Sequence, residues 1–173
     1  MTPTLPRPFD RRAAQAMWDA YAAAHPQALR TSDTFSVDRF GDSLELANEL
    51  LEVVINGPKR ATATLAAEFR AAGEPLPEIG SHWVACDGNG TPRAILRTIE
   101  LRVATFPEVD ERFAWDEGED DRSLESWRVE HRRYFERTCA ARGESFSEQD
   151  EIILERFAVV WPPEVADRRH HAQ

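Results

Sequence analysis

The chain has very little lysine, and this limits the kind of nucleic acid that it can bind. Of 21 basic residues in 173, only Lys59 is a lysine, and the arginines are scattered among 31 acidic residues. Proteins that coat duplex DNA or RNA neutralise several phosphates with lysine and arginine. The formal net charge of −10 therefore argues against a duplex DNA partner. A nucleoside in a small pocket, or a short single-stranded RNA, remains compatible with this charge.

Cysteines and long apolar runs are scarce as well. Cys86 and Cys139 are far apart, so reduced, buried thiols are expected instead of a disulfide framework or a metal knuckle. No run approaches the roughly 18 apolar residues that cross a bilayer, and we expect no membrane association. The opening MTPTLPRPFDRR lacks the apolar core of a signal peptide. The sequence thus predicts a cytoplasmic protein and leaves its oligomeric state open.

Hydrophobic periodicity predicts an α+β domain. Two N-terminal helices are expected over 9–25 and within FGDSLELANELLEVVING, and the segment 26–39 between them is interpreted as a polar connection. Asp42 is expected to cap the second helix, and Gly57 to end it as a left-handed glycine. The later patterns predict three further helices and four strands, which fall in RATATL, AAEFRAAG, HWVACDGNGTPRAILRTIELRVATF, PEVDERFAWDEGEDD, SLESWRVEHRRYFERTCAARG and IILERFAVVW. A small, largely antiparallel sheet or barrel flanked by helices is the expected architecture.

The stretch NGPKRATATL places a basic and a hydroxyl side chain close together directly after the second helix. A threonine hydroxyl becomes nucleophilic when a neighbouring base takes its proton, and a neutral lysine amine can be that base. Lys59 must then be desolvated, because a free lysine titrates near about 10.4. Side chains three apart face opposite ways in an extended strand, but the turn at 57–61 can bring Lys59 and Thr62 together. The alternative is a surface lysine beside an ordinary strand threonine.

An acidic loop follows the expected short helix. Five carboxylates crowd six positions here: Asp116, Glu117, Glu119, Asp120 and Asp121. The run lacks the alternating ligands and central glycine of a calcium loop, and no metal site is predicted. One interpretation is a solvated loop. In the other, one carboxylate turns inward as an acid or base, with its pKa raised by the neighbouring charges.

Trp115, which adjoins this loop, also has two interpretations. Trp115 is either core material or a surface on which a base stacks. His131, on the apolar face of the last helix, is expected to be a core or boundary residue.

An ordered series of segments carries a resemblance to a known family. The segments are FGDSLELANELLEVVINGPKRATATL, GEPLPEIG, HWVACDGNGTPRAILRTIEL, FAWDEGEDDRSLESWR and ERFAVVWP. Together they resemble the ASCH domain of the PUA-like superfamily over about residues 35–161. The corresponding division is an N-terminal helix and connection over 1–34, an ASCH domain over 35–161 and a polar tail over 162–173.

The resemblance implies a small PUA-like β-barrel with a cleft for RNA or a modified nucleoside. The family motif G-x-K-x-x-T is present with Lys59 and Thr62, and A-x-x-E-G is present with Glu117. In similar amidohydrolases, residues at these positions hydrolyse the acetyl amide of N4-acetylcytidine. Other ASCH proteins are described as ribonucleases, and many have no known activity.

The function expected from the resemblance is therefore hydrolysis of an N4-acylated cytidine by Lys59, Thr62 and Glu117, without a cofactor. A metal-independent ribonuclease acting on single-stranded RNA and a non-catalytic RNA-binding or nucleotide-binding module remain as alternatives. Four residues are expected to contact the substrate: Arg60, Trp115, Arg122 and Ser123. The helix at 123–143 and the N-terminal helix are additions to the smallest amidohydrolases, and we expect them to reshape the cleft.

Overall fold

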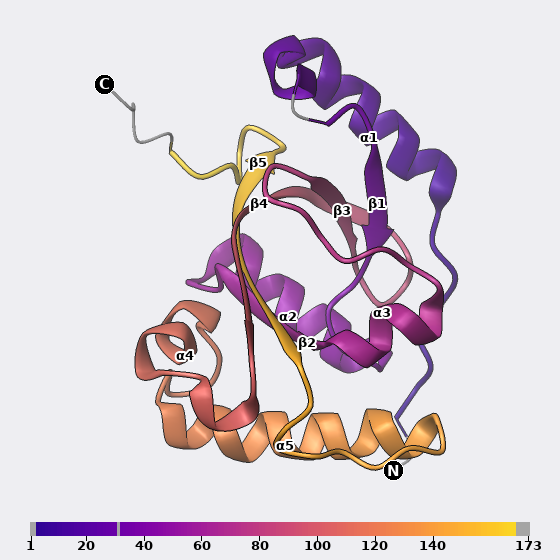
Figure 1. Ribbon diagram of the computed structural model, residues 1–173. Helices are drawn as coiled ribbons and strands as arrows, with labels where there is room; N and C mark the ends of the chain where they lie inside the picture. The colour runs from indigo at the N-terminus through magenta and orange to yellow at the C-terminus, as the bar shows by residue number, and fades with distance from the viewer. Residues whose placement is uncertain (1–2, 31, 169–173) are drawn as a thin grey trace. The chain divides into compact units, whose positions relative to one another are not determined.

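The computed structural model describes residues 3–30 and 32–168, which form two compact units (Figure 1). Unit 1 comprises the described residues of Met1–Gly57, Ile79–Ile99 and Phe157–Gln173, and unit 2 comprises Pro58–Glu78 and Glu100–Arg156. The end of the expected polar tail, from residue 169 onward, lies outside the described residues. Each unit has a hydrophobic core of its own.

The described residues contain both helices and a mixed sheet, which confirms the expected α+β class. The strands are β1 (Phe35–Asp38), β2 (Ala61–Leu65), β3 (His82–Cys86), β4 (Pro92–Ala104) and β5 (Ile152–Trp161), in the order β1-β3-β4-β5-β2. The α-helices are α1 (Arg11–Ala24), α2 (Leu44–Asn56), α3 (Ala66–Ala72), α4 (Glu111–Glu117) and α5 (Leu124–Ala141). Short 3-10 turns lie at Pro26–Arg30 and Phe106–Glu108. None of the helices in the described part of the chain has the length and apolar character needed to span a membrane.

In unit 1, the interpretation of 26–39 as a connection is wrong in part. Pro26–Arg30 forms a 3-10 turn, and β1 pairs in parallel with β3, so that Phe35 lies opposite His82. Figure 1 shows α1 alongside β1. A four-residue strand is stable only through its partner, and this partner follows more than 40 residues later in the chain. Local sequence therefore gives little sign of β1.

Both expected ends of α2 are corrected by the structure. Ser43, not Asp42, caps the helix, because its side chain accepts a hydrogen bond from the Leu46 amide at 3.1 Å. Gly57 is extended, with φ −134° and ψ −165°, and is not left-handed. A Cβ atom on this residue would lie 2.8 Å from the Val53 carbonyl oxygen. A glycine is thus needed here for close backbone approach.

In unit 2, the antiparallel pairing of β2 with β5 supports a compact core. The register places Ala61 opposite Arg156 and Leu65 opposite Ile152. One face of β2 is buried against α4 and α5, in a cluster that includes Ala61, Ala63, Leu65, Phe113, Ala114, Trp127, Phe135 and Leu154. Burial of a side chain the size of leucine or phenylalanine contributes about 1.5–3 kcal/mol. This packing fixes the ends of β2 and α4, where the polar residues of interest lie.

Candidate active site

Lys59 is a fully buried cation at the start of unit 2. It lies just before β2, and this segment is tied to α4 because the Arg60 amide donates to the Asp116 carbonyl at 2.8 Å. The Lys59 side chain is only 1% exposed. Its Nζ donates to the Ala61 carbonyl at 2.9 Å, and to Oε1 atoms of Glu117 at 3.3 Å and Glu119 at 2.5 Å. Two carboxylates and a carbonyl thus satisfy all three ammonium protons.

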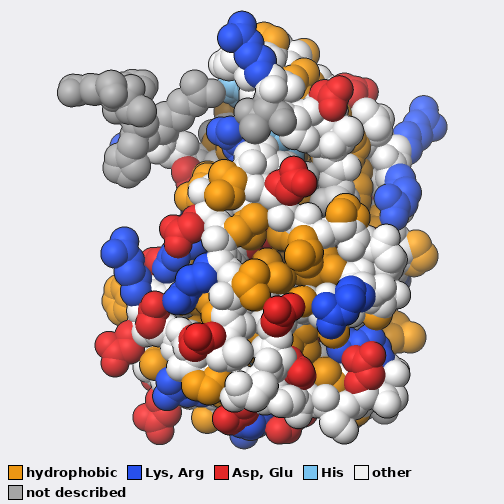
Figure 2. Space-filling model, in the orientation of Figure 1, with side chains coloured by type: hydrophobic (Ala, Val, Ile, Leu, Met, Phe, Trp, Pro, Cys, Tyr) orange, Lys and Arg blue, Asp and Glu red, His pale blue; other side chains and the backbone are white. Residues whose placement is uncertain are grey.

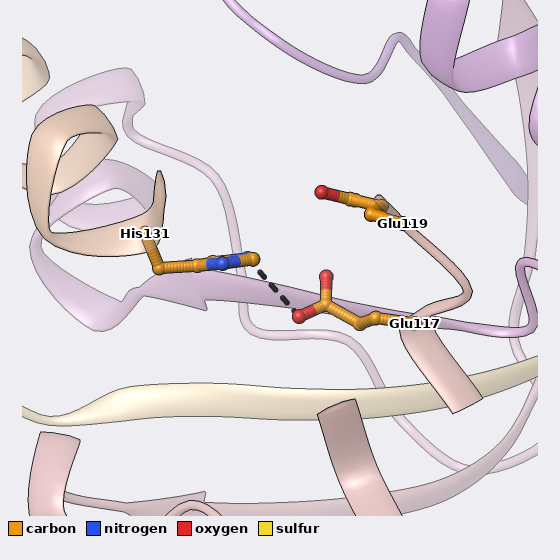
Figure 3. A group of neighbouring side chains, drawn as sticks. All are labelled: Glu117, Glu119 and His131. Atoms are coloured by element: carbon orange, nitrogen blue, oxygen red, sulfur yellow. Dashed lines mark ion pairs between the residues drawn. The ribbon is translucent and has the colours of Figure 1, made fainter. Parts of the chain in front are cut away.

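Glu117 is the centre of the cluster. It is the last residue of α4, a helix that Asp110 caps and that Gly118 ends in the left-handed conformation. Its Oε1 accepts from Lys59, and its Oε2 lies 3.0 Å from Nε2 of His131. The indole Nε1 of Trp127 also donates to Oε2. Figure 3 shows the His131 ring and the Glu117 carboxylate directed at one another, with Glu119 on the loop after α4.

His131 reaches Glu117 from α5. Its side chain is 10% exposed. The ring stacks on Trp127, one turn earlier in the helix, at 4.1 Å between ring centroids and 11° between planes. The second ring nitrogen, Nδ1, lies 2.9 Å from the carbonyl oxygen of Trp127. The ring is therefore held at both nitrogens and on one face.

Side chains of opposite charge in the cluster stabilise each other's charged forms. Burial would raise the pKa of Glu117, but His131 and Lys59 outweigh it and lower the pKa to about 2. Burial would lower the pKa of Lys59, yet the carboxylates of Glu119 and Glu117 raise it overall. In the same way, Glu117 raises the pKa of His131 against the effect of burial. An ionised carboxylate and a protonated lysine thus face each other at neutral pH.

The directions of these pKa shifts differ from those expected for Lys59 and for an inward-turned carboxylate. One interpretation required a neutral Lys59 as the base, but its neighbours hold the proton on the amine and raise its pKa. A raised pKa was expected for an inward-turned carboxylate, but Glu117 faces two cationic side chains and its pKa falls. Both expectations failed because the partner residues come from other elements of the fold.

Three of the side chains also have the donor atoms of a metal site. One ligand atom each from Glu117, Glu119 and His131 lies within 4.8 Å of the others. Lys59 Nζ, however, is already bonded to both carboxylates. The Lys59 ammonium thus occupies the position that a metal ion would need between the two carboxylates. The three side chains are therefore part of an ion-pair cluster.

Of the three residues expected to be catalytic, the structure brings Lys59 and Glu117 into contact. Thr62 lies in β2 opposite Glu155, and its side chain is half-buried. Strand alternation places Thr62 on the face opposite Ala61 and Ala63. Its hydroxyl has no hydrogen-bond partner among residues 3–30 and 32–168. The roles of all three residues remain predictions.

The residues expected to contact substrate have different surroundings. The Arg60 guanidinium donates to the Lys59 carbonyl at 2.6 Å. Trp115 is 55% exposed, and the Arg122 guanidinium lies 3.7 Å from its ring centroid and donates to its carbonyl. Ser123 caps α5 by accepting from the Ser126 amide. Ser123 thus has a structural role, while Trp115 and Arg122 form one exposed stacked pair.

Two members of the cluster, Glu119 and His131, were not predicted as site residues from the sequence. Glu119 could not be told apart from the other carboxylates of its loop. His131 did carry a signal, because it lies one helical turn after Trp127 on the buried face of α5. A polar ring on such a face needs a buried partner, and Glu117 is that partner.

Gly118 permits the close contact between the loop after α4 and the segment that carries Lys59. It has φ +67°, and a Cβ atom would lie 2.7 Å from the Lys59 backbone nitrogen. We expect Gly118→Ala to lower the free energy of unfolding by about 2–3 kcal/mol, since left-handed strain and a backbone clash add together. Urea denaturation monitored by circular dichroism measures this change.

Gly143 provides the matched control for this substitution. It has φ +74°, but no atom lies within 4 Å of the position of its Cβ among the described residues. Gly143→Ala should therefore cost only the strain, about 1 kcal/mol. Equal losses in the two variants would contradict the close packing of Gly118 on Lys59.

Comparison with known proteins identifies the family and the fold of the chain. The model of the ASCH domain matches residues 36–161. An ASCH domain from Lactobacillus crispatus JV V101, known from a crystal structure, is 30% identical in sequence to this chain. The two structures match with a TM-score of 0.79, over 89% of this chain and 97% of that chain. A protein from Enterococcus faecalis V583 is 29% identical, with a TM-score of 0.74, over 86% and 88% of the two chains. No curated protein matches the chain.

The family match spans most of the chain, and the structural similarity extends over nearly all of it. The expected PUA-like α+β fold is confirmed by this similarity. The chain belongs to the ASCH domain family.

Proposed function

We propose that the protein is a hydrolase that acts on an N4-acylated cytidine, with Lys59, Thr62 and Glu117 as its catalytic residues. The observation that carries this proposal is the buried contact between Lys59 and Glu117, 3.3 Å apart. Three residues after the lysine lies a threonine hydroxyl that has no partner in the described part of the chain. Buried charges are costly unless they are paired, and clusters of perturbed pKa values gather at functional sites.

The protonation states of the cluster assign the roles. Lys59, as an ammonium, stabilises the negative charge that develops on the acyl oxygen. Thr62 and Glu117 are not in contact in this structure, so Glu117, as a carboxylate, accepts the Thr62 proton through an intervening water while Thr62 Oγ1 bonds to the acyl carbon. Glu117 returns this proton to the leaving amine as the C–N bond breaks. Water then cleaves the threonine ester and releases the carboxylic acid, which restores the hydroxyl.

Access to the cluster is through Glu119 in this proposal. Its side chain is 21% exposed, whereas those of Lys59 and Glu117 are 1% and 2% exposed. The Glu119 carboxylate contacts Lys59 Nζ where an acyl oxygen would bind. We infer that substrate displaces Glu119, and that the loop after Gly118 moves to allow this.

A neutral nucleoside fits the charge of the protein better than a long polyanion does. Figure 2 shows acidic and basic side chains interspersed on the face that it draws. The exposed stack of Trp115 and Arg122 lies near Glu117 in the sequence and offers an aromatic surface for a base.

Release of acetate from N4-acetylcytidine tests this function. The purified protein should release acetate and cytidine, and Thr62→Ala should lower the rate at least about a hundredfold, as loss of a nucleophile does. Thr64→Ala is the matched control, because Thr64 is half-buried on the same face of β2. A Thr62→Ala variant as active as Thr64→Ala would overturn the assignment of the nucleophile. No release by the parent protein would overturn the proposed substrate.

A ribonuclease is the second candidate, and the charged state of Lys59 favours it. An ammonium can neutralise the charge that develops on a phosphate, while Glu117 activates the ribose hydroxyl. Cleavage of a short single-stranded RNA, lost in Lys59→Met but not with chelators, would support this candidate. Saturable binding of either ligand without turnover would instead indicate a binding module.

A further inference from the structure

His131 has hydrogen-bond partners at both ring nitrogens, and both partners are acceptors. The Trp127 carbonyl oxygen, 2.9 Å from Nδ1, can only accept. Nδ1 therefore carries a hydrogen. Nε2 lies 3.0 Å from Oε2 of Glu117, and a carboxylate oxygen also only accepts. One proton must therefore lie between Nε2 and Oε2.

The other contacts of Glu117 decide which atom holds this proton. Oε1 accepts from the Lys59 ammonium, and Oε2 accepts from the Trp127 indole as well as from His131. A carboxylate that accepts three hydrogen bonds is stabilised in its ionised form. The proton therefore belongs on His131.

We propose that His131 is a doubly protonated imidazolium at neutral pH and acts as the positioning residue of Glu117. It directs Nε2–H at Oε2, which leaves Oε1 toward Lys59 as the side of the carboxylate available for chemistry. This role in catalysis rests on the proposed function, whereas the protonation state does not.

The imidazolium also sets the charge of the buried cluster. The charged groups that face His131 are Glu117 at the end of α4, Glu119 on the following loop and Lys59 before β2. With His131 protonated, two cations balance two carboxylates. Loss of its proton leaves one buried negative charge in excess, and this excess repels an anionic ligand more than a neutral one. The site is thereby regulated by alkaline pH.

The protonation state can be observed directly by long-range ¹H–¹⁵N NMR of the histidine-labelled protein between pH 5 and 9. The signals of His131 are assigned by their loss in His131→Gln. We expect both ring nitrogens of His131 to show protonated shifts at pH 7. His82 provides a neutral reference, because burial beside Arg97 lowers its pKa to about 4. The shifts of a neutral imidazole for His131 at pH 7 would overturn the proposal.

Two variants separate the protonation from the catalytic role. Glu117→Gln should lower the midpoint of the His131 titration by at least about one pH unit, since the facing carboxylate is lost. An unchanged midpoint in a folded variant would contradict the pairing of His131 with Glu117. If the variant does not fold, the titration of His131 in the parent protein decides whether the ring is protonated at pH 7.

In an active protein, the alkaline decline of kcat/KM should follow the same midpoint and disappear in His131→Gln. A decline that persists there would overturn the positioning role. Imidazolium signals in a protein without hydrolytic activity would refute the proposed function alone.

Discussion

Replacing Lys59 with methionine is expected to lower the free energy of unfolding by about 3–5 kcal/mol. Methionine preserves much of the buried volume but removes the charge. Glu117 and Glu119 are then left facing each other without the cation that bonds to both. Removal of one partner from a buried ion pair costs about this much, because the remaining charge stays desolvated. Chemical denaturation at neutral pH measures the loss, and the proposed hydrolysis should also be abolished.

Two further variants identify the cause of this loss. Arg133 pairs with Glu130 on the surface of α5 and is 68% exposed, so Arg133→Met should change stability by less than about 1 kcal/mol. Adding Glu119→Gln to Lys59→Met removes one of the uncompensated carboxylates and should restore part of the stability. If Lys59→Met is no more costly than Arg133→Met, the buried cluster does not hold the charges described.

The free energy of unfolding is expected to be highest near about pH 6.5 and to fall on both sides. The pKa of Glu117 falls from 4.5 to about 2 on folding. Its contribution, on the order of 3 kcal/mol, is present above pH 4.5 and is lost as the pH falls toward 2. The pKa of His82 falls from 6.5 to about 4, so folding favours its neutral form. Its contribution is present above pH 6.5 and decreases as the pH falls toward 4.

The contribution of His131 to the free energy of unfolding depends on pH in the opposite direction. Its pKa is raised on folding, so its stabilisation is complete below pH 6.5 and is lost as the pH rises through the folded value. Denaturant titrations from pH 3 to 9 measure the profile. His131→Gln should flatten the alkaline side. It should also weaken the acidic slope, because His131 helps to lower the pKa of Glu117, but the part that comes from Lys59 and from His82 should persist. If the parent protein keeps the same stability from pH 6.5 to 9, a coupled Glu117–His131 pair is excluded.

Much of the fold could be predicted because its elements have strong local signals. The amphipathic pattern of α2 and the alternating small residues of β2 indicated elements that the structure confirms. β1 was missed, since its four residues are stabilised by a distant strand. The cap of α2 was placed one residue early because aspartate and serine are both good caps. Local sequence does not distinguish between two adjacent capping residues.

The candidate site was harder to predict than the fold. The contact between Lys59 and Glu117 was expected only through the family resemblance, because 58 residues separate them in the chain. Protonation could not be predicted at all. It depends on Glu119 and His131, and neither is one of the motif positions that carried the resemblance. Residue type and spacing identify candidates, but the charge of a buried group depends on neighbours that folding brings to it.

The burial of Lys59 has a practical consequence, because it is the only lysine in the chain. Reagents that acylate amines have a single lysine side chain as their target, and this side chain is 1% exposed. Its modification must wait for the segment around it to open. The rate of labelling at Lys59, followed by mass spectrometry of the peptide that contains it, would therefore report how often this segment opens. A bound ligand that closes the cluster would slow the labelling, whatever the chemical class of that ligand.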